Sequence, residues 1–269
     1  TGSFNVAMGT DALLNNTTAS ANTAVGYQAL TTNTTGGDSA AFGYQAAQSN
    51  TTGSYFTAIG RQALFNNTTG SYNTAVGYQS LFSHTGLGNS YHTASGALAL
   101  YSTTTGVRNT AFGYAAGFGI TTGNYNTAIG MQALNGSCTA NANTAVGYTA
   151  MYSTTSGANN VGLGYAALFD NTTGYSNTAV GYDALANNTT AQKNTAIGDS
   201  SGFSTTTGSW NTFVGRQAGY SNTTGTSNTY VGEFSGQSTT GELNTFVGNL
   251  SGTYITTGQK NTILGRYNG

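Results

Sequence analysis

The sequence contains no proline, a single cysteine and few charged side chains. Only six Lys or Arg and seven Asp or Glu residues occur among 269, which gives a net charge of -1. Nucleic acids and anionic membranes are bound by clustered Lys and Arg, and here these residues are scattered, so neither partner is indicated. The lone Cys138 excludes an internal disulfide framework and a cysteine-based zinc site. We expect it to be a small side chain in a corner of the fold.

Long apolar runs and targeting patterns are missing as well. No run approaches the ~18 consecutive apolar residues of a membrane helix, so we expect no membrane insertion. No basic-then-apolar signal pattern opens the chain, and its start at Thr1 instead of Met predicts a processed chain or a fragment. Forty glycines, with abundant Thr, Asn, Ser and Ala, indicate a low-complexity or repetitive chain.

A motif of the form Asn-Thr-Ala-Val-Gly recurs over the whole length. With its glycine as an anchor there are sixteen copies, spaced by 17 residues except for one step of 19 and one of 16. The consensus is NTAVGYQALxxNTTGxx, and the anchors are Gly9, Gly26, Gly43, Gly60, Gly77, Gly96, Gly113, Gly130, Gly147, Gly164, Gly181, Gly198, Gly215, Gly232, Gly248 and Gly265. A short fixed period predicts a solenoid with one coil per repeat. We call each repeat a rung and number its positions from the anchor glycine, position 0.

The residue types favour strands over helices. Rungs of 17 residues with two glycines and β-branched Thr and Val are too short for a helix pair, whereas short strands joined by glycine turns fit. The sequence therefore predicts an all-β protein, a parallel β-solenoid of about sixteen rungs that forms one domain over residues 1–269.

Two neighbouring positions are apolar in almost every rung. Position -1 is apolar in fifteen of sixteen rungs, for example Val25 and Phe42, and we expect it to be core. Position -2 is Ala in eleven rungs, from Ala7 to Ala196. Adjacent strand residues face opposite sides, so both faces should be covered. One face lines the coil, and the other packs most economically on a second chain, which predicts a homo-oligomer.

Large residues exchange places between two positions. Where position +4 is Leu, as at Leu30, position -2 is Ala or Gly; where position +4 is Gly219, Gly236 or Gly252, position -2 is Phe213, Tyr230 or Phe246. Such a trade conserves core volume. It predicts two sections, residues 1–202 with a Leu and Ala core and residues 203–269 with a Gly and aromatic core. Two rungs with Ala beside Gly117 and Gly202 break the trade, and we expect Phe118 and Phe203 to fill them.

Polar positions are equally regular. Asn at position -4 and Thr at position -3 each recur thirteen times, which predicts side-chain ladders between rungs. Thr-Thr-Gly recurs ten times and predicts a turn whose glycine has φ > 0. Both length changes lie before this turn, at His84 to Gly88 and near Gly236 to Thr240, which indicates an exposed corner.

Catalytic residues would have to break the repeat. His84 and His92 flank the long step without a third ligand nearby, and we expect a surface loop pair rather than a metal site. The acids Asp11, Asp183, Asp199 and Glu233 leave a paired-carboxylate glycosidase open in principle, but isolated solvated acids fit better. The sequence therefore predicts no catalytic, metal or cofactor-binding residues and no cofactor.

One position suggests recognition. Tyr follows the anchor glycine at Tyr27, Tyr44, Tyr78, Tyr114, Tyr148, Tyr165 and Tyr182, often with Gln next. Tyrosine faces beside amides suit sugars or protein surfaces, but such a column also stacks on itself between rungs. Both interpretations stay open, with stacking favoured.

The motif NTAVGYQAL and its variants resemble the head repeats of trimeric autotransporter adhesins. The longer form NTAVGYQAL...NTTG is more similar to repeats of phage tail-fibre proteins. The resemblance covers essentially all 269 residues, although the adhesin coils have a shorter period. It implies a left-handed β-roll, a homotrimer and an extracellular location on a virion tail fibre or a bacterial surface.

The favoured hypothesis is a non-enzymatic structural and adhesive fibre segment that provides or projects binding to a cell-surface glycan or protein receptor. A variant is a self-assembling extracellular filament, because neither Thr1 to Gly9 nor Tyr267 to Gly269 resembles a polar cap. An ice-binding β-solenoid and a glycan-degrading tailspike are the alternatives from other classes.

Overall fold

The computed structural model describes residues 2–86 and 88–266. Leu87 of the predicted insertion, and Thr1 and Tyr267 to Gly269 of the predicted uncapped ends, lie outside the described residues. The chain is all-β, and its sixteen short strands pair in parallel, which confirms the predicted β-solenoid. Two compact units, Thr1–Thr139 and Ala140–Gly269, are described separately below.

Every rung contributes one strand of three residues. The first unit contains β1 (Val6–Met8), β2 (Thr23–Val25), β3 (Ala40–Phe42), β4 (Thr57–Ile59), β5 (Thr74–Val76), β6 (Thr93–Ser95), β7 (Thr110–Phe112) and β8 (Thr127–Ile129). The second contains β9 (Thr144–Val146), β10 (Val161–Leu163), β11 (Thr178–Val180), β12 (Thr195–Ile197), β13 (Thr212–Val214), β14 (Thr229–Val231), β15 (Thr245–Val247) and β16 (Thr262–Leu264).

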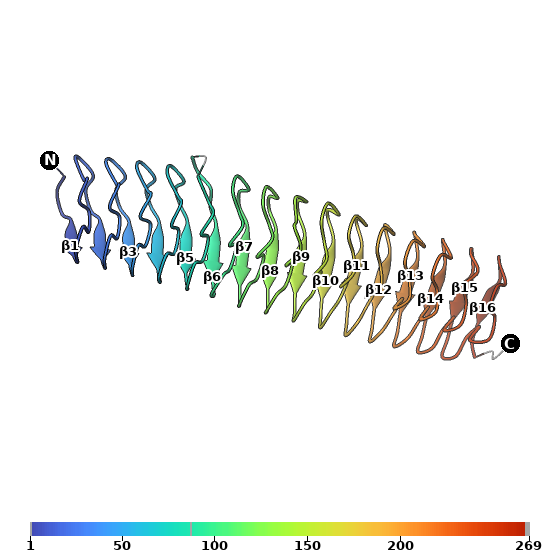
Figure 1. The fold of residues 1–269 in the computed structure, drawn as a ribbon. Coiled ribbons are helices and arrows are strands. Elements are labelled where there is room, and N and C mark those ends of the chain that lie inside the picture. The colour runs from blue at the N-terminus through green and yellow to red at the C-terminus, as the bar shows by residue number, and fades with distance from the viewer. Residues whose placement is uncertain (1, 87, 267–269) are drawn as a thin grey trace. The chain divides into compact units, whose positions relative to one another are not determined.

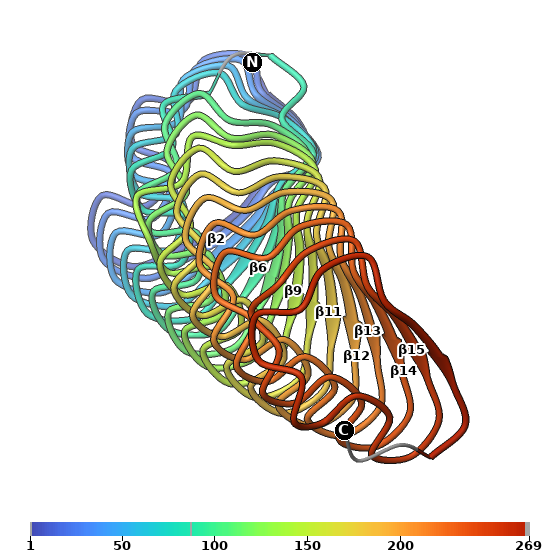
Figure 2. The same cartoon turned by 90° about the vertical axis from the view of Figure 1, so that its right-hand side faces the viewer.

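Within each unit the strands pair so that equal positions of successive rungs are neighbours. Thr57, for example, pairs with Thr74, and Ala58 pairs with Ala75. Figure 1 shows the strands of each unit side by side along one edge of the coils. In Figure 2 the coils of each unit appear as similar outlines laid one behind the next. Identical positions therefore form columns that run from rung to rung.

The anchor glycines end the strands in a conformation that other residues rarely adopt. At Gly60 φ is +131°, and a Cβ on this residue would lie only 2.5 Å from the carbonyl oxygen of Gly77 in the next rung. Only glycine tolerates both the backbone angle and the close approach of a neighbouring backbone. This double constraint explains why position 0 is glycine in every copy.

The prediction that the glycine of Thr-Thr-Gly has φ > 0 is wrong. Gly53 lies outside the left-handed region, and it is confined because a Cβ there would lie 2.4 Å from the carbonyl oxygen of Gly70. Positive φ occurs instead at non-glycine positions -5, +2 and +4, as at Tyr55, Gln62 and Leu64. Crowding between rungs, not turn conformation, therefore selects this second glycine.

The prediction that position -1 is core is also wrong. Position -2 points into the coil, where Ala24, Ala58 and Ala111 have no exposed surface. Position -1 points outward, and Phe42 and Ile59 are about two-fifths exposed. The two positions do face opposite sides, as predicted, but the inward and outward faces were exchanged. The small residues at position -2 point inward, because the long Leu side chains at position +4 fill the space there.

The exchange of volume between positions -2 and +4 is present in the second unit. A Cβ on Gly219 would lie 2.5 Å from the ring of Phe213, and one on Gly252 would lie 2.5 Å from the ring of Phe246. Phe213, Tyr230 and Phe246 are fully buried and stack on one another, with ring centroids 5.5 and 5.0 Å apart. Each aromatic ring at position -2 thus occupies the space that a side chain at position +4 would fill.

The two expected fillers do not enter the core. A Cβ on Gly117 would meet the side chains of Leu100 and Ile120, and one on Gly202 would meet Phe213 and Leu185, so these residues occupy the space. Phe118 and Phe203 are half-buried and stack outside, on Tyr101 and Tyr220. The assignment of Phe118 and Phe203 was wrong because position +5 faces outward.

Asparagine ladders hold the rungs together inside the coil. The backbone N–H of Asn177 donates to Oδ1 of Asn160 (2.9 Å), while Asn177 Nδ2 donates to the carbonyl oxygen of Ala191 (2.8 Å). A second ladder lies at position +7, where Asn50 Nδ2 donates to Asn33 Oδ1 (2.9 Å). These bonds pair buried amides of successive rungs, which confirms the predicted Asn ladder and adds one that the sequence did not predict.

Replacing Gly60 by alanine should destabilise the first unit more than replacing Gly53. The Gly60→Ala backbone strain alone costs about 1–3 kcal/mol, and the new Cβ meets a carbonyl oxygen of the next rung. Alanine at position 53 meets a similar crowding but no unfavourable φ, and Ala19 and Ala191 occupy the equivalent position in other rungs. Thermal unfolding followed by circular dichroism measures the difference, and equal losses in Tm would contradict the double constraint.

The core exchange predicts rescue in a double variant. Phe213→Ala should cost about 3–5 kcal/mol because it leaves a cavity, and Gly219→Leu should cost about 1–3 kcal/mol because it overpacks against Phe213. The double variant restores the Ala and Leu combination of the other rungs and should recover most of the stability. A denaturant-based double-mutant cycle checks this, and simple additivity would refute it.

Candidate functional site

The seven predicted tyrosines lie on the outer surface, directly after the outward-facing strand residues. All seven are between two-fifths and about half exposed. Tyr27 stacks on Tyr44 with ring centroids 5.2 Å apart, and Tyr165 stacks on Tyr182 at 4.9 Å. These spacings match the distance between neighbouring strands, so stacking follows from the repeat itself. In a stacked pair the rings cover one another's faces.

Arg61 takes the place of a tyrosine within this column. Its guanidinium lies 5.5 Å from the ring centroid of Tyr44 and 5.9 Å from that of Tyr78. A cation between two rings continues the ladder by cation–π contact. Tyr114, by contrast, has Ala97 and Met131 as its column neighbours.

A glutamine ladder runs beside these tyrosines at position +2. Gln45 Nε2 donates to Gln28 Oε1 (3.0 Å), Gln62 Nε2 donates to Gln45 Oε1 (2.9 Å), and Gln79 Nε2 donates to Gln62 Oε1 (2.9 Å). Each of these amides is tied to its neighbour between rungs. The ladder stops where Leu98 takes the glutamine position.

A second exposed aromatic column, at position -5, was missed. Tyr55, Tyr72 and Tyr91 stack with ring centroids 5.0 and 5.1 Å apart, and Arg108 then lies between Tyr91 and Tyr125, 5.6 and 5.3 Å from their ring centroids. The consensus has no fixed residue at this position, so averaging over all rungs hides the signal. Reading the first unit alone would have found it.

A third aromatic column is half-buried at position +5. Phe65, Phe82, Tyr101 and Phe118 stack in sequence, with ring centroids 5.1 to 5.2 Å apart. Asn135 follows Phe118 at the same position in the next rung, so the stack of rings ends at Phe118.

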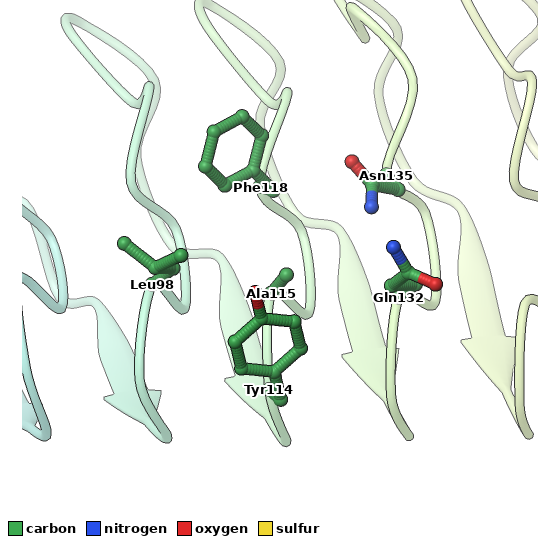
Figure 3. A pocket seen from close by; sticks show the side chains of 6 residues that line it. All are labelled: Leu98, Tyr114, Ala115, Phe118, Gln132 and Asn135. Carbon is green, nitrogen blue, oxygen red and sulfur yellow. The ribbon is translucent and has the colours of Figure 1, made fainter.

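A hollow opens on the surface of the first unit where these columns are interrupted. It has a volume of about 250 Å³ and is lined by Leu98, Tyr114, Ala115, Phe118, Gln132 and Asn135. Figure 3 shows Leu98 on one side, the two amides on the other, and the remaining three residues between them. Its lining is mainly apolar, with two amide groups and no charged side chain.

The expectation that His84 and His92 form a surface loop pair is wrong, because both are buried. Their rings meet edge to face, with centroids 4.9 Å apart. His92 occupies the Asn column at position -4: its Nδ1 accepts from the backbone N–H of Asn109 (3.2 Å), and its Nε2 lies 2.8 Å from the carbonyl oxygen of Gly106. The proton therefore resides on Nε2, and the neutral ring reproduces the bonds of an asparagine.

His84 occupies the other Asn column, at position +7. Its Nε2 lies 2.9 Å from Oγ of Ser90. Burial, with a smaller contribution from nearby His92, lowers the pKa of His84 to about 3, and burial lowers the pKa of His92 to about 4. Both rings are neutral at ordinary pH and serve as structural replacements for asparagine.

The four acids do not converge on one place. Asp11 lies in the first unit, and Glu233 is exposed in the second, where its Oε1 accepts from Arg216 Nη1 at 3.3 Å. Asp183 and Asp199 lie in successive rungs, and burial, followed by the charge of Asp199, raises the pKa of Asp183. Asp199 Oδ1 accepts a hydrogen bond from Ser200 Oγ (2.9 Å). These two acids interact electrostatically, and neither of them lines the hollow between Leu98 and Asn135.

Cys138 is fully buried, as expected for a small side chain in the fold. In residues 2–86 and 88–266, no group of three or more His, Cys, Asp or Glu side chains is arranged to hold a metal ion. That part of the chain also contains no helix long and apolar enough to cross a membrane.

Fold and surface together define the class of the protein, a parallel β-solenoid with laddered aromatic and amide side chains on its outside. A comparison with protein-family profiles, curated proteins and solved structures gives no match. The proposals below therefore depend on the chemistry of this surface and on the resemblance of the repeat.

The buried histidines predict a loss of stability in mild acid. Below pH about 6.5 both histidines become protonated in the unfolded chain. In the folded chain the pKa is about 4 for His92 and about 3 for His84, so both rings stay neutral over most of this range. The free energy of unfolding should therefore fall as the pH decreases through this window, by at most about 1.4 kcal/mol per pH unit for each ring.

The variant His92→Asn keeps the consensus bonds and removes one titrating group. It should be more stable than the natural chain at pH 5 and close to it at pH 7.5, in denaturant unfolding followed by circular dichroism. Adding His84→Asn should flatten the dependence further. An identical pH dependence in all three chains would refute the assignment.

Proposed function

We propose that this chain is a structural and adhesive fibre segment without enzymatic activity, which associates with further copies of itself and binds surface receptors. The resemblance to adhesin heads and phage tail fibres adds a homotrimer and an extracellular location, on a virion or a bacterial surface, to this proposal. One observation carries the association: the outward face of the strands is apolar.

An apolar stripe at position -1 runs along each unit, and Ser95 interrupts it once in the first unit. Its large exposed members are Met8, Phe42, Ile59, Phe112 and Ile129 in the first unit and Leu163, Ile197, Val247 and Leu264 in the second. Soluble monomers rarely expose contiguous apolar surface of this kind, whereas interfaces between subunits do. A second chain would bury the stripe, and strands of equal spacing would match its period.

The receptor-binding part of the proposal rests on the aromatic columns. Exposed tyrosines beside amide side chains offer apolar faces and hydrogen-bonding groups together, which suits glycans and protein surfaces. Repeated weak sites on an oligomer gain strength through multivalency. The interior, in contrast, consists largely of apolar and Asn columns that recur in most rungs, as expected for a structural segment.

Native mass tests the association. Light scattering after size exclusion should give a multiple of the 27.3 kDa chain, threefold for a trimer. The double variant Ile59→Lys/Phe112→Lys should shift the mass toward the monomer, because it puts two charges on the stripe. The control Tyr72→Lys/Tyr125→Lys changes residues of similar exposure at position -5 and should keep the native mass.

Circular dichroism must show that both variants are folded. A clean monomer of the natural chain would contradict self-association and would direct attention to an ice recrystallisation assay. Large heterogeneous particles would favour the filament.

A further inference from the structure

The tyrosine and glutamine ladders are both interrupted around the rung of Gly113. In the tyrosine column, Ala97 and Met131 flank Tyr114, so neither neighbour covers a face of its ring with another ring. Tyr114 is 52% exposed and makes no ring contact with another described residue. The repeat thus leaves this one tyrosine without its usual stacking partners.

Near this interruption, two amide side chains lack a hydrogen-bond partner among residues 2–86 and 88–266. Leu98 and Ala115 replace two successive glutamines, so Gln132 has no glutamine to bond on that side. Among the described residues, neither the Gln132 nor the Asn135 side chain has a hydrogen-bond partner. Gln45 and Gln62, in contrast, form a hydrogen bond with each other through their side-chain amides. Figure 3 shows the ends of Gln132 and Asn135 directed toward one another at the edge of the hollow.

We propose that this hollow is a binding site for a single neutral hexopyranose ring, with the apolar C–H face of the sugar on Tyr114 and its hydroxyl groups on the Gln132 and Asn135 amides. Aromatic faces and amides are the two kinds of group that a sugar ring needs, one for its C–H face and one for its hydroxyls. This inference rests on the proposed adhesive function and names the ligand class for one site of it.

Size and charge select this occupant. A volume of about 250 Å³ lies just below the roughly 300–1,000 Å³ of drug-sized pockets, so it takes one ring and not an extended ligand. No charged side chain lines the hollow, so a sialic acid or a phosphorylated sugar would find no counter-ion there. Leu98 and Phe118 supply further apolar walls.

The variant Ala115→Gln is the sharpest test, because it restores the consensus residue. The new glutamine would fill the hollow and could bond Gln132, so the chain should fold at least as well as before while the site is lost. Tyr114→Ala removes the aromatic face. Tyr165→Ala is the matched control, since Tyr165 is equally exposed but stacks on Tyr148 and Tyr182.

Saturation-transfer-difference NMR with glucose, galactose, mannose and N-acetylglucosamine at millimolar concentration measures binding to the whole chain. We expect transfer to the C–H protons of at least one of these sugars, a loss of at least about tenfold in affinity in Ala115→Gln and Tyr114→Ala, and no loss in Tyr165→Ala. Circular dichroism verifies that each variant is folded.

Two results overturn the site: no transfer to any of the four sugars, or transfer that Ala115→Gln leaves intact. Neither result changes the native mass, which tests the proposed self-association separately. Conversely, a monomeric chain that binds a sugar through Tyr114 would refute the self-associating fibre and keep the site.

Discussion

The structure depends on how closely the backbone of one rung approaches the next at the anchor glycines. A Cβ at these positions would lie 2.2 to 2.8 Å from a carbonyl carbon or oxygen of the following rung in nearly every case, closer than real Cβ atoms come. Because this contact allows no side chain, it fixes the distance between coils and holds every other position of a rung over its equivalent. Asn ladders, ring stacks and amide ladders all follow from that alignment.

Much of the fold could be predicted because the repeat samples each position sixteen times. Period and β-branched residues specify short parallel strands, and the recurrent Asn specifies a buried ladder. The inward face could not be assigned by alternation alone, since alternation does not say which of Ala24 and Val25 points inside. Volume decides it: only a small residue at position -2 leaves room for a Leu at position +4.

The errors at single residues share a cause. His84 and His92 were judged by their nearness to an insertion, yet counting from the anchors places them at positions +7 and -4, both of which are buried Asn columns. Phe118 and Phe203 were judged by size, yet position +5 faces outward. The aromatic column that contains Tyr55 and Tyr72 was not predicted, because position -5 is aromatic in only part of the chain. In a repeat, position within the rung is more informative than residue type or sequence neighbourhood.

The parallel ladders also have a mechanical consequence. Hydrogen bonds between successive strands, such as those joining β4 to β5, run along the direction in which the coils of a unit are stacked. A pull along that direction loads all the contacts between rungs in series, so the weakest contact limits the tensile strength of a unit. Rungs that depart from the consensus, such as the two that carry His84 and His92 or those that line the surface hollow, are where such a unit would yield first.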